Sequence, residues 1–140
     1  MADKLTFLLD SSAFLAYLND EPGREQGQEI LALGKSHKCQ LVMFLINLGE
    51  VLYITKRTRG LPGTQMVQAL VERLPLEFLK ASRDLILNAA QIKASHALSH
   101  ADAFAVASAI CEDAIVLIGD PEYHTVEDLV KVEWLVKYTS

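Results

Sequence analysis

The stretch from Leu5 to Ser12, with the sequence LTFLLDSS, decides the fold. It begins as an apolar run interrupted by one threonine, and the run stops abruptly at Asp10. Short apolar runs of this kind are typical of strands that are buried on both faces, as in parallel sheets. The residues after Asp10 then adopt a helical spacing of apolar positions, so a buried strand should lead directly into a helix.

The same alternation of short apolar runs and helical patterns continues along the chain. Strands that alternate with helices predict βαβ units, that is, an α/β fold with a parallel β-sheet flanked by helices on both faces. No internal repeat or linker interrupts the pattern, so we expect one domain over residues 1–140. The expected strands cover residues 5–9, 39–44, 76–79, 114–118 and 132–136, and the expected helices cover residues 11–19, 24–37, 47–59, 62–74, 83–96 and 99–112.

The composition is that of a globular protein. Of the 140 residues, 51% are hydrophobic and 22% are charged, which excludes a disordered chain. The formal net charge is −5, which argues against a broad cationic surface that wraps nucleic acid by charge alone. Nucleic acid stays possible as a substrate, because a bound metal ion inverts the local sign of a carboxylate site.

The cysteines and the apolar runs indicate in which cellular compartment we expect the protein. Cys39 and Cys111 form neither a C-x-x-C motif nor a disulfide framework, and we expect both to be buried thiols in a reducing compartment. The apolar run near the N-terminus is shorter than the roughly 7–15 residues of a signal-peptide core. No run approaches the roughly 18 residues of a membrane span, so we expect a cytoplasmic protein without membrane association.

Four acidic residues occupy positions that matter in such a sheet. Asp10 and Asp120 end two of the expected strands, Asp102 lies in the first turn of a helix, and Glu50 lies in the helix after the second strand. Ligands of open parallel sheets gather at the carboxyl ends of the strands. Clustered carboxylates repel one another unless a cation neutralises them, and such oxygen ligands suit Mg²⁺ or Mn²⁺. The four acids therefore form a candidate metal site.

Each of these acids also has a purely structural explanation. Asp10 is suited to cap the helix that follows it, Asp120 precedes a proline as an N-cap residue often does, and Asp102 fits a capping box. Glu50 lies in an otherwise apolar stretch, so we expect it to be partly buried with either a cation or Arg57 as its partner. In the second case Glu50 and Arg57 would form an ordinary internal salt bridge.

The surroundings of the four acids carry a family resemblance. The motifs are LLDSSAFLA around Asp10 with EPG at residues 21–23, INLGEV around Glu50, SHADA around Asp102 and IGDPEY around Asp120. In this order and spacing, over about residues 4–138, the chain resembles the PIN domain family and, within it, the VapC-type toxins. The resemblance implies a PIN-like three-layer α/β/α fold and a carboxylate site that binds Mg²⁺ or Mn²⁺ and cleaves RNA, or DNA in some branches.

The resemblance also implies roles for individual residues. Asp10 and Asp120 would bind the metal, Asp102 would help to bind it or orient the attacking water, and Glu50 would act through water or as a base. Glu122 matches an auxiliary acid of many members. One position departs from the family. The residue two before the last acid is often threonine or serine in the family, whereas this chain has Ile118 there.

Other residues are expected to serve the substrate and the partners. Asn47 is three residues before Glu50 and shares its helix face, so it is suited to hydrogen-bond substrate or a ligand carboxylate. Lys56 and Arg57, with Arg59, are the densest basic cluster and the candidate RNA contacts, although a solvated helix end explains them equally well. No interleaving of basic and aromatic residues indicates a platform for single strands. The resemblance implies a small antitoxin partner and a homodimer.

Two other functions stay open at this stage. One is a non-catalytic PIN-like binding module, which the missing hydroxyl at Ile118 favours. The other is a different small α/β metal-dependent phosphohydrolase. Metal binding without RNA cleavage would favour the module, and release of phosphate from small esters would favour the phosphohydrolase.

Overall fold

The computed structural model describes residues 4–118 and 121–135, and it has a five-stranded parallel sheet with the order β3-β2-β1-β4-β5. The expected α/β fold is confirmed. The strands are β1 (Leu5–Leu9), β2 (Cys39–Phe44), β3 (Glu77–Leu79), β4 (Ile115–Ile118) and β5 (Val132–Trp134). The helices are α1 (Ser11–Leu18), α2 (Arg24–Lys35), α3 (Leu45–Arg73), α4 (Arg83–Ser95), α5 (His100–Glu112) and the 3₁₀ helix η1 (Pro121–Val126).

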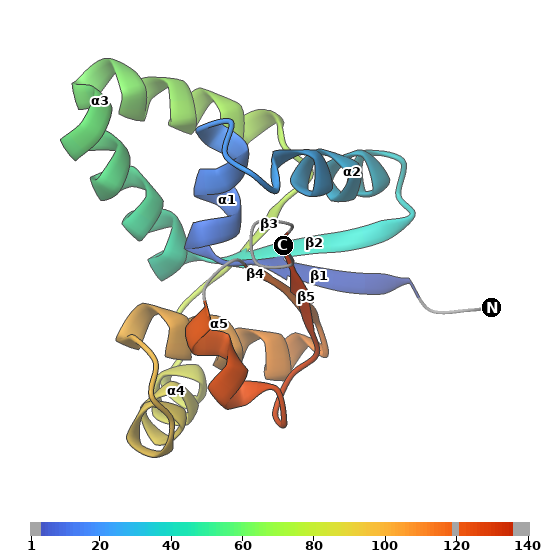
Figure 1. Cartoon of the computed structure of the whole chain (residues 1–140), viewed down its shortest axis with the longest axis vertical. Helices are drawn as coiled ribbons and strands as arrows, with labels where there is room; N and C mark the ends of the chain where they lie inside the picture. The colour runs from blue at the N-terminus through green and yellow to red at the C-terminus, as the bar shows by residue number, and fades with distance from the viewer. Residues whose placement is uncertain (1–3, 119–120, 136–140) are drawn as a thin grey trace.

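The helices form two layers that enclose the sheet. Figure 1 shows α1, α2 and α3 on one face of the sheet, and α4 and α5 on the other. This three-layer arrangement explains why β1 and β2 read as unbroken apolar runs, since strands covered on both faces have no solvent side. The last strand is at an edge, as expected, and it ends at Trp134, while Val136 lies outside the described residues.

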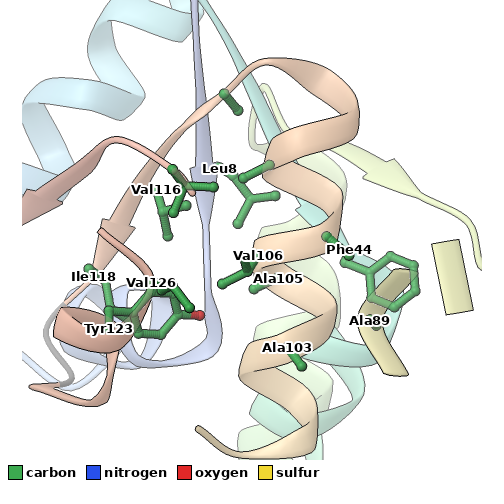
Figure 2. Close-up of a cluster of buried hydrophobic side chains, with 14 of the residues drawn as sticks. Leu8, Phe44, Ala89, Ala103, Ala105, Val106, Val116, Ile118, Tyr123 and Val126 are labelled. Atoms are coloured by element: carbon green, nitrogen blue, oxygen red, sulfur yellow. The ribbon is translucent and has the colours of Figure 1, made fainter. Parts of the chain in front are cut away.

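Alternate side chains of the strands pack into two separate hydrophobic cores, one on each face of the sheet. Leu8 of β1 pairs with Val42 of β2 and Val116 of β4, and all three point toward α5. Figure 2 shows this core, in which the small residues Ala103 and Ala105 let α5 lie close to the sheet. The other face packs against α1, α2 and α3 through a second set of strand residues: Phe7, Leu9, Leu41, Met43 and Leu117.

A glycine bends α3 near its middle. Gly60 has φ +70° and ψ −168°, a combination that glycine tolerates and other residues avoid. The sequence predicts two helices here, one that ends at Gly60 and one that begins near Pro62, and the kink confirms that prediction. The first part, which begins at Leu45, leaves the sheet directly from the end of β2 (Figure 1). That part carries Asn47, Glu50 and Arg57.

The direction of the chain connections reverses next to β1. From β1 the chain moves to β2 and β3 on one side, and it later returns to β4 and β5 on the other side. The carboxyl ends of β1 and β4 therefore flank a topological switch point, where open parallel sheets bind their ligands. Asp10 comes directly after β1 and stands at that point.

Two further observations concern the expectations on thiols and membranes. Cys39 is buried, but Cys111 is exposed, so the expectation of two buried thiols is wrong for Cys111. Cys111 lies in the last turn of α5, on the side of that helix turned away from the sheet. In the part of the chain that the structure describes, no helix has the length and apolar character needed to cross a membrane.

Candidate functional site

Asp10 stands at the start of α1 and caps it. Its Oδ1 accepts hydrogen bonds from the backbone N–H of Ala13 at 3.0 Å and from the hydroxyl of Ser12 at 2.9 Å. The residue is only 1% exposed. The structural explanation for Asp10 is therefore correct, and it is compatible with a ligand role, because the cap holds the carboxylate in one orientation at the switch point.

Asn47 joins the beginnings of three helices. Its side chain is 0% exposed, and its Nδ2 donates to the carbonyl of Ala101 at 3.1 Å and to the hydroxyl of Ser11 at 3.4 Å. The Ser11 hydroxyl in turn donates to the backbone carbonyl of Asn47 at 3.1 Å. Ser11 follows Asp10 and Ala101 precedes Asp102, so Asn47 brings these two acids to the same corner of the molecule.

Asp102 lies in the first turn of α5 and is 6% exposed. Its backbone N–H donates to the hydroxyl of Ser99, the N-cap residue, at 3.1 Å, which confirms one of the two hydrogen bonds of the predicted capping box. The Tyr123 hydroxyl donates to Oδ1 of Asp102 at 3.4 Å. Figure 2 shows the ring of Tyr123 beside Ile118 and Val126, with its hydroxyl oxygen directed toward α5. The backbone of Asp102 is thus fixed at the start of α5, and its carboxylate accepts a hydrogen bond from η1.

The other predicted acids have different surroundings. Glu50 is half-buried on α3, one helical turn after Asn47. Glu122 is exposed, and its Oε2 accepts a hydrogen bond of 3.2 Å from the backbone N–H of Ser99, so it contacts the start of α5 from η1. Asp120 lies outside the described residues.

Among the described residues Glu50 and Arg57 form no salt bridge, so the structural alternative for Glu50 is wrong. Arg57 instead places its guanidinium 5.0 Å from the centre of the Tyr53 ring, an exposed cation–π contact. Lys56 is exposed beside it. Within the described ranges neither Lys56 nor Arg57 forms an ion pair, so both cations face solvent.

The buried oxygen atoms of this corner fit a hard cation. Within residues 4–118 and 121–135, no three acidic, histidine or cysteine side chains gather closely enough to hold a metal, so Glu50 does not complete a triad. Mg²⁺, however, is usually held by one or two carboxylates and keeps several waters. Asp10 and Asp102 supply two buried carboxylates, and Oδ1 of Asn47 is a buried acceptor that no described group hydrogen-bonds.

The helices add a favourable potential to the corner. Asp10 and Asp102 both lie at helix N-termini, where the backbone dipoles carry partial positive charge. That potential stabilises the buried carboxylates and also attracts an anion such as a phosphate. The corner is therefore suited to hold both a divalent cation and the phosphate that the cation would neutralise.

Sequence reasoning missed two residues of this corner. Tyr123, which the sequence analysis gives no role, is fully buried and contacts Asp102. The spacing of Tyr123 and Val126, three residues apart after an apolar strand, is the only signal that indicates burial. Ser11 was expected only as a helix residue, and no sequence signal links it to Asn47, which is 36 residues away.

Comparisons with known proteins agree with this fold. The family model described as "PIN domain" matches residues 7–129. No curated protein matches the chain significantly. Because the identities to solved structures are 14–18%, the structural likeness below concerns the fold alone.

Three solved structures illustrate that likeness. VapBC2 from Rickettsia felis, bound to a DNA fragment from its promoter, has a TM-score of 0.74 at 14% identity, with 92% of this chain and 98% of that chain covered. VapC20 from Mycobacterium tuberculosis, described as a toxin that cleaves the sarcin-ricin loop, has a TM-score of 0.71 at 18% identity, with 91% of this chain and 98% of that chain covered. DNA-bound VapBC from Salmonella typhimurium has a TM-score of 0.70 at 17% identity, with 92% of this chain and 97% of that chain covered.

Proposed function

Because the chain belongs to the PIN domain family, we propose that it is a Mg²⁺- or Mn²⁺-dependent endoribonuclease that hydrolyses RNA phosphodiester bonds. The observation that carries the proposal is the corner in which Asn47 ties Asp10 and Asp102 together. Aspartate side chains are seldom buried this deeply, and here two of them, 1% and 6% exposed, lie at one corner. Such an arrangement is typical of sites that are used for chemistry.

The protein's own groups have distinct tasks in this proposal. A bound Mg²⁺ or Mn²⁺ would lower the pKa of a water and stabilise charge on the phosphate. Asp10 and Asp120 would hold the cation directly. Asp102, whose carboxylate is oriented by Tyr123, would help to hold it and would orient the attacking water. Glu50 would act through water or as a base.

The remaining predicted residues would support that reaction. Asn47 would keep the two buried acids in place and present its Oδ1 to a ligand. Glu122 would act as an auxiliary acid through its contact with the start of α5. Lys56 and Arg57 would bind the RNA backbone, since both are exposed cations on the helix that carries Glu50.

We also propose the biological setting that the sequence analysis predicts. The chain would be a cytoplasmic, VapC-type toxin that pairs with a small antitoxin protein and forms a homodimer. The structures of similar fold include toxin–antitoxin complexes, which supports an antitoxin partner. The whole chain, residues 1–140, would act as one PIN-like domain, because both cores lie on the faces of one sheet.

Cleavage of end-labelled RNA tests the proposed reaction. Purified, antitoxin-free protein should cut total RNA into discrete fragments in Mg²⁺ or Mn²⁺, and cleavage should stop in EDTA. Asp102→Asn should lose the activity, whereas Glu29→Gln, which removes an exposed acid on α2, should keep it. Cleavage that persists in Asp102→Asn would refute the assigned site and indicate a contaminating nuclease.

One observation favours the non-catalytic binding module as a second candidate. Ile118 is fully buried beside Tyr123 and Val126, where many family members carry a hydroxyl. The position faces the α5 side of the sheet, so a side-chain hydroxyl there would lie near the Tyr123 that contacts Asp102. Metal binding without any RNA cleavage, measured by calorimetry on the same protein, would favour this second function.

A further inference from the structure

An exposed aromatic ring stands on α3 close to the carboxylate corner. Tyr53 is 49% exposed, so about half of its side chain is accessible to solvent. It follows Glu50 by three residues, or about 4.5 Å along the helix axis. The same helix carries the buried Asn47, which joins the starts of α1 and α5, and the ring lies about 9 Å further along the helix axis.

Tyr53 belongs to a stripe along one flank of the helix. Ile46, Glu50, Tyr53 and Arg57 follow one another at intervals of four, three and four residues, a spacing that places side chains on the same side of a helix. Three of them are exposed and Glu50 is half-buried, whereas the helix face that packs inward carries other residues. The stripe therefore forms a solvent-accessible surface along α3 that includes Glu50.

The chemistry of this stripe is suited to a nucleotide. Arg57 lies over the Tyr53 ring at 5.0 Å, so a cation and a flat aromatic surface are held together. Lys56 adds a second exposed cation, in a chain with a net charge of −5. Stacking on aromatic rings together with cation–π contacts is how proteins bind unpaired bases without reading their sequence. The sequence has no repeated interleaving of basic and aromatic residues, and the structure adds that this one pair lies on an exposed face of α3.

We propose that Tyr53 is a specificity-determining residue on which one unpaired base of the RNA stacks, while Arg57 contacts the adjacent phosphate. The inference rests on the proposed function for the position of the scissile phosphate. Bases within a duplex are stacked on each other and cannot lie on a protein ring, so Tyr53 selects single-stranded segments. The half-exposed ring keeps area for a base beside the part that Arg57 covers.

Fluorescence of a short oligoribonucleotide tests this platform. The probe carries one 2-aminopurine, whose emission is quenched when the base stacks, and phosphorothioate linkages, which slow cleavage so that binding is measured in Mg²⁺. The proteins are the wild type, Tyr53→Leu, Tyr53→Phe and Leu61→Ala. Leu61 is an exposed apolar residue of the same helix beyond the Gly60 kink, and it serves as the matched control.

Tyr53→Leu should weaken binding of the single strand by about tenfold and should remove the quenching. Tyr53→Phe should stay within about twofold of the wild type because it keeps the ring, and so should Leu61→Ala. Binding of the same sequence as a duplex should be equal in all four proteins. Equal single-strand binding by Tyr53→Leu and the wild type, or no detectable binding by any protein, would overturn the inference.

Two further measurements distinguish a base-stacking ring from a protein interface and from the catalytic site. Light scattering should give the same mass for the wild type and Tyr53→Leu, and a lower mass in the variant would show that the ring belongs to a protein interface instead. Quenching that depends on Tyr53 in a protein that cuts no RNA would refute the proposed nuclease while the platform stands. Metal-dependent cleavage with full activity and binding in Tyr53→Leu would refute the platform alone.

Discussion

The side-chain amide of Asn47 donates a 3.1 Å hydrogen bond to the carbonyl of Ala101, across 54 residues of sequence. This bond joins the start of α3 to the start of α5, directly beside Asp102. The same amide reaches Ser11, which is adjacent to Asp10. One fully buried side chain therefore sets how closely two acids from distant parts of the chain approach each other.

Asn47→Ala should destabilise the protein and reduce its activity. The substitution removes two buried hydrogen bonds, one to the Ser11 hydroxyl and one to the carbonyl of Ala101, at a total cost of about 1–3 kcal/mol in the free energy of unfolding, while Ser11 keeps its bond to the backbone carbonyl of residue 47. Urea unfolding followed by circular dichroism measures this loss. Asn88→Ala, which truncates an exposed asparagine of α4, is the control and should change stability by less than about 0.5 kcal/mol.

Asp10→Asn should have opposite effects with and without metal. In EDTA the variant should be at least as stable as the wild type, since asparagine is an equally good N-cap residue and one buried charge is removed. In Mg²⁺ the wild type should gain stability by binding, by about 2.7 kcal/mol at a hundredfold excess over the dissociation constant. The variant should lose most of that gain.

Thermal unfolding at a series of Mg²⁺ concentrations measures both effects of the Asp10 substitution. The midpoint of the wild type should rise with the logarithm of the metal concentration. An identical rise in Asp10→Asn would show that this carboxylate holds no metal. Glu29→Gln, on the exposed face of α2, should respond as the wild type does.

Tyr123→Phe should lower activity more than it lowers stability. The substitution keeps the ring in its apolar cluster and removes the hydroxyl, whose hydrogen bond to Asp102 is long at 3.4 Å, so we expect a cost to stability of about 1 kcal/mol or less. Loss of that contact frees the Asp102 carboxylate to rotate, and we expect kcat to fall by about tenfold, as removal of an orienting group does. Unchanged kcat would mean that Tyr123 only packs.

Two substitutions at Ile118 test whether this buried position tolerates a hydroxyl. Ile118→Val should cost about 1 kcal/mol in the free energy of unfolding, whereas Ile118→Thr, of nearly the same shape as valine, should cost about 1–3 kcal/mol more because it buries a hydroxyl. If the Tyr123 hydroxyl accepts a bond from the new hydroxyl, the two variants will be equally stable. Urea unfolding of the pair decides between these outcomes.

The two thiols should differ strongly in reactivity. Burial raises the pKa of the Cys39 thiol, so little thiolate forms there, and the side chain is also inaccessible. Cys111 is exposed and should react with a thiol reagent in the native state, while Cys39 should react only after unfolding. Mass spectrometry of protein alkylated at about pH 8, near the ordinary pKa of a thiol, should show one modified site. Two modified sites without denaturant would contradict the described burial.

The elements of the fold could be predicted from local patterns. The apolar runs of β1 and β2, the break at Gly60 and the N-caps at Asp10 and Ser99 each depend on a few neighbouring residues, and the structure has all of them. Alternation of strands and helices is enough to indicate a parallel sheet, because the crossover connections of such a sheet need helices.

Tertiary structure alone decided how the acids and their neighbours meet. Tyr123 reaches Asp102 and Asn47 reaches Ala101 only because the order of the strands brings η1, α3 and α5 to one edge of the sheet. The solvent exposure of Tyr53 likewise depends on the face that α3 turns inward, whereas its contact with Arg57 follows from the four-residue spacing on one helix. Local sequence sets the period of a helix or strand, but contacts between distant residues follow from how the layers pack, which no local pattern encodes.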